Sequence, residues 1–213
     1  MTEAARGSTR PAETRKNWII PPARRGRLVS AHRRRRMPPA KTLRAFGLER
    51  GKTLLDVGCG PGYFSIPACR IVGPAGAVLA CDISPIMLRD ARRGAKEAGA
   101  ANLRLRRCKD PEIPFPDASA DLALLAFVVH ETASVEGILA ETRRVLRPGG
   151  RAAFLEWHPR ETEQGPPVGA RLGKSDLTLR LGEAGFAVSR SGSLNPETYF
   201  LLARPKAARR ARP

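Results

Sequence analysis

From residue 53 to residue 65 the chain reads Thr-Leu-Leu-Asp-Val-Gly-Cys-Gly-Pro-Gly-Tyr-Phe-Ser. Apart from the carboxylate of Asp56, the first five residues have the character of a buried β-strand. The glycines at 58, 60 and 62 allow a sharp turn and the close approach of a ligand to the main chain. A helix is expected next, with its free N–H groups facing a nucleotide-like ligand. The alternative is a tight turn between strand and helix that binds nothing.

The spacing of these glycines separates two classes of nucleotide site. Dinucleotide-binding loops require a third glycine five residues after the first, where this chain has Tyr63. The segment instead resembles motif I of the class I S-adenosylmethionine-dependent methyltransferases, in which Asp-x-Gly-x-Gly-x-Gly follows two hydrophobic residues. The resemblance implies that S-adenosylmethionine, and not NAD, is the cofactor.

Asp82 ends the next apolar strand, residues 77–81, and lies 24 residues after Gly58. A carboxylate at this point can accept hydrogen bonds from both hydroxyls of a ribose bound in the loop. The alternative role is capping of the following helix, but Ser84-Pro85 already supplies a cap and a first-turn proline. We therefore expect Asp82 to be free for a ligand.

Two further phrases extend the resemblance. Residues 113–121, Ile-Pro-Phe-Pro-Asp-Ala-Ser-Ala-Asp, and residues 146–150, Leu-Arg-Pro-Gly-Gly, are similar to phrases of the ubiquinone-biosynthesis-like methyltransferases. Ala120 replaces the usual Phe, a departure that affects packing. The resemblance covers roughly residues 40–203. It implies that Asp110 accepts a hydrogen bond from the adenine amino group. The cofactor-binding residues expected on this basis are Asp56, Gly58, Cys59, Gly60, Gly62, Tyr63, Asp82, Ile83, Asp110 and Phe127.

Strand and helix patterns alternate six times along the chain, and two strands follow that are joined by a loop at 191–198. Alternation predicts a parallel sheet with helices on both faces, and the short last connection predicts an antiparallel pair. The fold class expected is α/β, a doubly wound, seven-stranded, mostly parallel sheet with an antiparallel C-terminal hairpin. Its central strand is expected at 122–129 and the next strand at 151–157.

The catalytic residues expected are His130, Glu131 and Trp157, because sheets of this kind place substrates beyond the carboxyl ends of their strands. His130 could act as a general base for an acceptor with an ionisable proton, or be an ordinary strand-end residue bonded to the backbone. Trp157 could face a cationic centre or belong to the core. No residues are expected to bind a metal ion. Residues 158–175 and 18–36 are expected to cover the acceptor pocket.

The net charge of +18 is concentrated at the ends of the chain. Residues 1–50 carry 14 Lys and Arg against 3 acids, and residues 204–213 carry 5 against none, whereas residues 51–203 carry 19 against 17. We expect a basic, mostly flexible extension at 1–36, a methyltransferase domain at 37–203 and a basic tail at 204–213. The tails could contact RNA or simply be solvated.

Three functions are compatible with these features. A small-molecule methyltransferase is favoured, because the 191–198 loop leaves no room for a target-recognition domain. The alternatives are an RNA methyltransferase that uses the basic tails, and a non-catalytic cofactor-binding partner subunit. The longest apolar run, 122–129, is far shorter than the roughly 20 residues that span a bilayer. The four cysteines form no C-x-x-C pair, and a cytoplasmic location is expected. The oligomeric state is left open.

Overall fold

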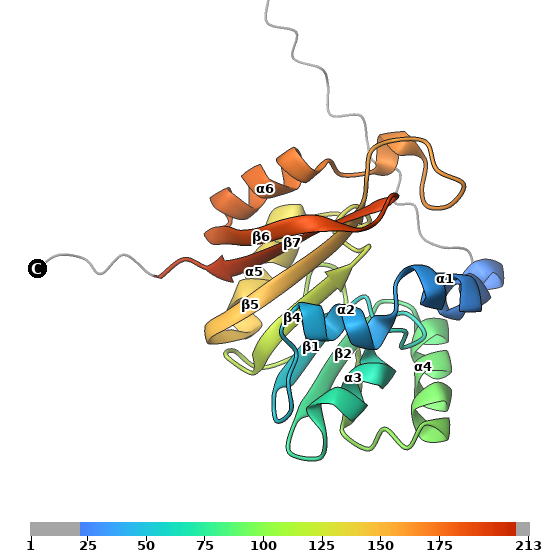
Figure 1. Ribbon diagram of the computed structural model, residues 1–213. Coiled ribbons are helices and arrows are strands. Elements are labelled where there is room, and N and C mark those ends of the chain that lie inside the picture. Colours follow the sequence, from blue (N-terminus) through green and yellow to red (C-terminus); the bar gives the residue numbers. More distant parts are fainter. Residues whose placement is uncertain (1–21, 208–213) are drawn as a thin grey trace, which may run out of the picture.

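The structure is a computed structural model that describes residues 22–207. Its centre is a seven-stranded sheet in the order β3-β2-β1-β4-β5-β7-β6 (Figure 1). The strands are β1 (Thr53–Val57), β2 (Ala77–Asp82), β3 (Leu103–Arg107), β4 (Ala120–Ala126), β5 (Leu146–Trp157), β6 (Phe186–Asn195) and β7 (Thr198–Pro205). Pairing is parallel from β3 to β5, and β7 is antiparallel to both of its neighbours. The expected fold class, including the antiparallel hairpin, is confirmed.

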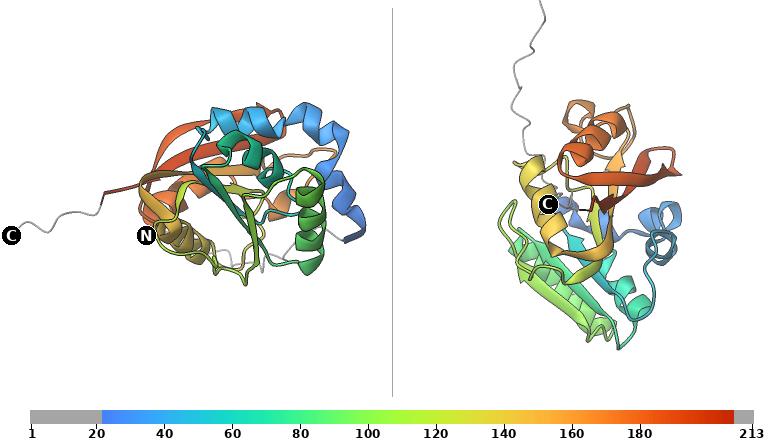
Figure 2. Two further views of the ribbon diagram at one scale, coloured as in Figure 1. Left: turned by 90° about the horizontal axis from the view of Figure 1, so that it is seen from below. Right: turned by 90° about the vertical axis from the view of Figure 1, so that its left-hand side faces the viewer.

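Helices cover both faces of this sheet (Figure 2). They are α1 (Ala31–Arg36), α2 (Pro39–Ala45), α3 (Ser65–Val72), α4 (Pro85–Glu97), α5 (Val135–Val145) and α6 (Lys174–Glu183), with 3-10 helices η1 (Pro22–Val29) and η2 (Val168–Ala170). Side chains alternate along a strand, so Leu54 packs toward α2 and α3 whereas Leu55 packs toward α5 and α6. The same alternation separates Val78 from Leu79 in β2.

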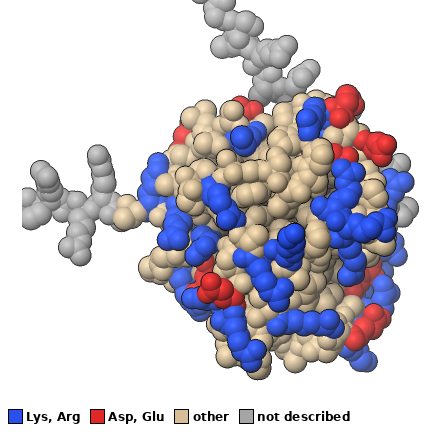
Figure 3. Space-filling model, in the orientation of Figure 1, with Lys and Arg blue, Asp and Glu red and all other residues tan. Residues whose placement is uncertain are grey.

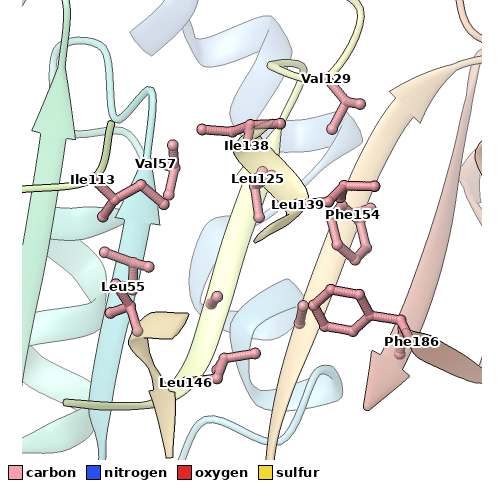
Figure 4. Close-up of a cluster of buried hydrophobic side chains, with 14 of the residues drawn as sticks. Leu55, Val57, Ile113, Leu125, Val129, Ile138, Leu139, Leu146, Phe154 and Phe186 are labelled. Carbon is pink, nitrogen blue, oxygen red and sulfur yellow. The ribbon is translucent and has the colours of Figure 1, made fainter. Parts of the chain in front are cut away.

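The larger of the two main core clusters lies between the sheet and α5. Figure 4 shows Leu125 and Phe154 from neighbouring strands pointing at Ile138 and Leu139 of this helix, and all four are buried. Burying a side chain of this size contributes about 1.5–3 kcal/mol. The helix begins where the sequence predicts, because the side chain of Ser134 accepts a hydrogen bond from the Gly137 N–H. This packing holds the carboxyl ends of β4 and β5 in fixed positions.

The central strand is shorter than expected. It ends at Ala126, because Phe127 has a φ of 64° and turns the chain away from the strand direction. The Phe127 N–H still donates to the Leu155 carbonyl at 2.7 Å, which keeps the turn against β5. The prediction that the strand reaches Val129 is therefore wrong. His130 lies in a turn just beyond the carboxyl end of β4.

The C-terminal hairpin corrects a second prediction. The turn is only Pro196 and Glu197, not the loop expected at 191–198, because β6 continues to Asn195. Serine and glycine have low strand propensity, which conceals this part of the strand in the sequence. Gly192 pairs with Phe200, and a Cβ on Gly192 would lie only 2.9 Å from the Phe200 ring. Glycine is needed there so that the ring can pack over the strand.

The described part of the predicted basic extension is folded. Residues 22–36 form η1 and α1, and the side chain of Ser30 caps α1 by accepting from the Arg33 N–H. This differs from the mostly flexible segment expected at 1–36. Trp18, the preceding residues and the tail beyond residue 207 lie outside the described residues. Within residues 22–207, no helix is long and apolar enough to cross a membrane.

Candidate active site

A cavity of about 490 Å³ opens beyond the carboxyl ends of β1, β2, β4 and β5. This is the position at which doubly wound sheets bind ligands, and the volume is within the usual range of small-molecule pockets. The structure brings together there the three expected catalytic residues and all the expected cofactor-binding residues except Gly62. A Cβ on Gly62 would lie 2.9 Å from Ile66 and 3.7 Å from Ala91, so this glycine serves the packing of α3 against α4.

The glycine loop between β1 and α3 forms one wall of this cavity. Gly58 has a φ of 64°, and a Cβ at this position would lie 2.5 Å from Val128. Only glycine fits both the torsion and this contact. The Gly60 N–H donates to Oδ2 of Asp82 at 2.8 Å, which ties the loop to the end of β2. The loop therefore presents its main chain to the cavity in a fixed shape.

Asp82 has more partners than the sequence indicates. Besides the contact with Gly60, its Oδ1 accepts from the Ser84 N–H at 2.8 Å. That Asp82 is available to a ligand stays a prediction. The predicted cap is correct, because the Ser84 side chain accepts from the Met87 N–H. A carboxylate has about four lone-pair sites, so Asp82 retains capacity for the two hydroxyls of a ribose. Burial raises its pKa above the usual range.

The neighbouring residues suit the flat base of an adenosine. Ile83 is 44% exposed on the cavity wall, although large apolar side chains are mostly buried in the described chain. Asp110 also lines the cavity, and its carboxylate accepts from the Thr132 hydroxyl at 2.5 Å and the Ala133 N–H at 2.7 Å. An apolar surface between two carboxylates fits a ring that carries hydrogen-bond donors at its edge. The adenine contact of Asp110 stays a prediction.

Asp56 lies at the floor of the cavity in β1. It is buried, and its Oδ2 accepts from the Ser65 hydroxyl at 2.5 Å. Burial raises the pKa of Asp56 to about 7, and the nearby Asp82 contributes in the same direction. The Cys59 thiol has a raised pKa for the same main reason, so it is protonated at neutral pH. A cationic group bound above Asp56 would stabilise its carboxylate.

His130 is held by a residue that the sequence interpretation missed. Nδ1 of His130 lies 2.7 Å from Oε2 of Glu156, and Oε1 of Glu156 accepts from the His130 backbone N–H at 3.2 Å. Glu156 is fully buried at the end of β5. It is the one acid in the strand expected at 151–157, which was the available signal. Its partner is 26 positions away and comes close only through the pairing of β4 with β5.

Two other expected catalytic residues stand beside this pair. Oε1 of Glu131 lies 3.8 Å from Nε2 of His130, and burial raises the pKa of Glu131 to about 7. The rings of Phe127 and Trp157 are 5.1 Å apart and line the same cavity. Trp157 is therefore a pocket residue as well as a packing residue. The site combines an oriented imidazole, a half-buried carboxyl and two aromatic walls.

The segment between β5 and α6, which we name the 158–173 loop, is organised by Arg171. Its guanidinium donates to the carbonyls of Pro166, His158, Arg160 and Gln164 and to the Thr162 hydroxyl. These five acceptors match the five N–H donors of a guanidinium. Arg171 also lies 5.4 Å from the Trp157 ring, so the loop is fastened beside the cavity. Sequence reasoning placed a cover here but did not identify Arg171.

Arg171→Lys is expected to loosen the 158–173 loop without weakening cofactor binding. Lysine has three donors, so at least two hydrogen bonds are lost, each worth about 0.5–1.5 kcal/mol. Hydrogen exchange of the loop amides should accelerate by about one to two orders of magnitude, while calorimetry with S-adenosylmethionine is unchanged. Arg160→Lys, in the same loop with an exposed side chain, is the control. Equal protection in both variants would show that Arg171 does not organise the loop.

The residues fit S-adenosylmethionine as a whole. A ribose would meet Asp82, and the adenine would meet Ile83 and Asp110. The cationic end of the cofactor would meet the glycine loop and Asp56. This assignment uses the chemistry of the donors and acceptors that line the cavity.

Comparisons with known proteins agree with this fit. A family model described as "Methyltransferase domain" matches residues 55–154. The chain is 34% identical over 116 residues to a demethylmenaquinone methyltransferase of Listeria welshimeri, covering 54% of this chain and 49% of the relative. It is 31% identical over 161 residues to an arsenite methyltransferase of Halobacterium salinarum, covering 71% of this chain and 41% of that protein. The chain thus matches about half the length or less of these curated relatives.

A solved structure extends the similarity over nearly the whole fold. The crystal structure of an S-adenosylmethionine-dependent methyltransferase from Aquifex aeolicus superimposes with a TM-score of 0.83 and 29% identity, covering 87% of this chain and 98% of that one. The strand order, the glycine loop with Asp82 and these similarities support one assignment. The chain belongs to the class I S-adenosylmethionine-dependent methyltransferases.

Proposed function

We propose that this chain transfers a methyl group from S-adenosylmethionine to a small-molecule acceptor that gives up a proton in the reaction. The observation that carries this proposal is the His130–Glu156 pair, which stands in the same cavity as the glycine loop. A buried carboxylate paired with an imidazole is a typical arrangement for orienting a general base.

When bound, S-adenosylmethionine supplies a methyl group that its sulfonium already activates. The chain therefore has to align the acceptor and exclude water. Glu156 is buried and acceptor-only when ionised, so Nδ1 of His130 donates to it and Nε2 carries the lone pair. Nε2, which is buried beside Glu131 in this structure, is thus the atom that would receive the acceptor's proton. With the cofactor bound, the bond from the acceptor nucleophile to the methyl carbon would form as the bond from that carbon to sulfur breaks.

The walls of the cavity indicate the class of acceptor. Phe127 and Trp157 offer flat apolar surfaces, and Glu131 and Glu163 place carboxylates nearby. This combination favours a neutral, planar ring with an ionisable hydroxyl over an anionic acceptor. A hydroquinone or phenol has these properties, and several relatives of this chain are named demethylmenaquinone methyltransferase. Proton removal would activate such a ring at carbon or at oxygen.

The two alternative functions lack comparable support. An RNA methyltransferase would depend on basic tails that lie largely outside the described residues. A non-catalytic partner subunit does not account for a histidine clamped by a fully buried glutamate at the substrate end of the sheet. Both alternatives remain outcomes of the assay below.

A transfer assay with S-adenosylmethionine labelled in its methyl group tests the proposal. The acceptors would be a set of hydroquinones and phenols, with their methyl ethers, which carry no ionisable proton, as matched controls. We expect label to enter the hydroxylated compounds and not the ethers. Label found only in RNA would overturn the proposal, as would cofactor binding with no transfer to any compound.

A further inference from the structure

Residues 22–36, which comprise η1 and α1, form a cover on the cavity. Figure 1 shows them at the same end of the sheet as the glycine loop, and Leu28, His32, Arg33 and Arg36 line the cavity. No residue of α1 is buried, so the helix is not held by the apolar core. Met37, which follows α1, is buried in the core, and the cover itself is held by a few contacts of its arginines. We call this segment the N-terminal cover.

Two ion pairs fix the ends of the N-terminal cover. Arg25 Nε lies 2.8 Å from Asp90 Oδ2 on α4, and Arg36 Nη2 lies 3.2 Å from Glu197 Oε1 in the β6–β7 turn. The Tyr63 hydroxyl also donates to the Met37 carbonyl at 2.6 Å. Both arginines are partly exposed, and such pairs contribute only about 0–1 kcal/mol each. The cover is therefore weakly fastened by the chain alone.

Arg33 points inward from the cover and, unlike Arg36, forms no ion pair with an acid within residues 22–207. Its guanidinium lies 4.4 Å from the centre of the Tyr63 ring and 5.4 Å from that of Phe127, and Nη1 donates to the Leu28 carbonyl at 3.0 Å. The side chains of Arg34 and Arg35 are exposed instead. Lys and Arg gather over α1 on the surface, at the right of Figure 3. Arg33 differs from them because it is directed into the cavity.

The surroundings of Arg33 do not balance its charge directly. Burial lowers the pKa of Arg33 to about 10. The charges of Tyr63 and Asp56 act in the opposite direction and raise this pKa by smaller amounts. In residues 22–207 its recorded contacts are two aromatic rings and one carbonyl, none of which is an anion. A partly buried guanidinium with aromatic faces and free donors is suited to an anion with two oxygen atoms.

The orientation of the cofactor brings such an anion to this place. Asp82, Ile83 and Asp110 assign the adenosine to the β2 and β3 side of the cavity. The amino-acid end of S-adenosylmethionine then lies toward Asp56 and the N-terminal cover. That end carries one ammonium and one carboxylate, and this side of the cavity offers the buried carboxyl of Asp56 and the guanidinium of Arg33. The charges of these two residues are therefore opposite in sign to those of the amino-acid end of the cofactor.

We propose that Arg33 binds the carboxylate of S-adenosylmethionine, and that this contact fastens the N-terminal cover over the occupied pocket. The proposal rests on the assignment of the cofactor but not on methyl transfer or on the acceptor. Cofactor binding tests it separately from the proposed function.

The experiment compares two ligands on the full-length chain. Decarboxylated S-adenosylmethionine keeps the adenosine, the sulfonium and the ammonium and lacks only the carboxylate. Arg33→Met keeps an apolar stem on Tyr63 and Phe127 and removes the guanidinium. By calorimetry, we expect Arg33→Met to bind S-adenosylmethionine about 10- to 100-fold more weakly, with unchanged affinity for the decarboxylated ligand. Arg35→Met, an exposed arginine of the same helix, should bind both as the wild type does.

Hydrogen exchange measures the second part of the proposal. In the wild type, S-adenosylmethionine should slow exchange of the amides of residues 25–36, and decarboxylated S-adenosylmethionine should slow it much less. The contact of Arg33 with the carboxylate is overturned if Arg33→Met weakens both ligands equally, or neither. The fastening of the cover is overturned if both ligands protect it to the same extent. Unchanged affinity for the decarboxylated ligand also shows that the variant is folded.

Discussion

His130→Asn is expected to lower the turnover number by about 10²–10⁴-fold, the usual contribution of a general base, while affinity for S-adenosylmethionine stays unchanged. The asparagine amide can still donate to Glu156 from near the position of Nδ1, but it has no basic atom in place of Nε2. The measurement is steady-state turnover with an acceptor found in the transfer assay, together with calorimetry for the cofactor. His130→Asn thus removes the base and keeps the partner of a buried carboxylate.

The matched variants separate catalysis from stability. His130→Ala leaves Glu156 buried without this partner, so it should lose turnover and also unfold more easily, by about 3–5 kcal/mol. Glu156→Gln keeps the shape and removes the charge that orients the imidazole, so a smaller loss of turnover and an altered pH profile are expected. Turnover of His130→Asn close to that of the wild type would remove His130 from the reaction and leave alignment as the mechanism.

Asp82→Ala has the largest expected effect on cofactor binding, a loss of about two to four orders of magnitude. Charge-assisted hydrogen bonds contribute about 1.5–3 kcal/mol each, and a carboxylate that accepts two ribose hydroxyls forms two of them. The same substitution removes the acceptor of the Gly60 and Ser84 N–H groups, so the glycine loop also loses support. Calorimetry with S-adenosylmethionine measures the sum of both effects.

A cofactor analogue without ribose hydroxyls separates these two effects. If Asp82 binds the hydroxyls, Asp82→Ala should weaken the natural cofactor far more than the analogue, which lacks the groups in question. An equal loss for both ligands would assign the effect to the loop instead. Undiminished affinity for the natural cofactor would refute the ribose assignment. Glu97→Ala, which removes an exposed carboxylate outside the cavity, is the control.

The sequence was sufficient to predict which residues of the expected cofactor site share one cavity, apart from Gly62, because its signals are local. Asp56, the glycines and Asp82 lie at strand ends, where each residue's type and position already indicate its chemistry. The sheet architecture could be predicted for a similar reason, since alternating strands and helices permit few topologies. Gly62 shows the limit of this reasoning, because a glycine within the motif can serve helix packing and not the ligand.

The other features depend on contacts between distant segments. Glu156 looks like an unusual core residue until β4 and β5 pair and bring His130 to it. Arg33 is one of four successive arginines, and only the orientation of α1 distinguishes it from its exposed neighbours. The length of β6 was missed because a Ser-Gly-Ser segment gains its strand conformation from pairing with β7. In each case, contacts between distant segments determine the role or conformation of the residue, and local propensity does not.

Arg171 has a consequence for the evolution of this chain. One side chain satisfies four carbonyls of the 158–173 loop, and main-chain carbonyls are present whatever residues occupy those positions. Mutations elsewhere in the loop can therefore accumulate while the loop keeps its course beside Trp157. Descendants of the gene could acquire new acceptors by exchanging these side chains, with the sheet and the cofactor residues inherited intact. Arg171 itself would be the position at which such variation is not tolerated.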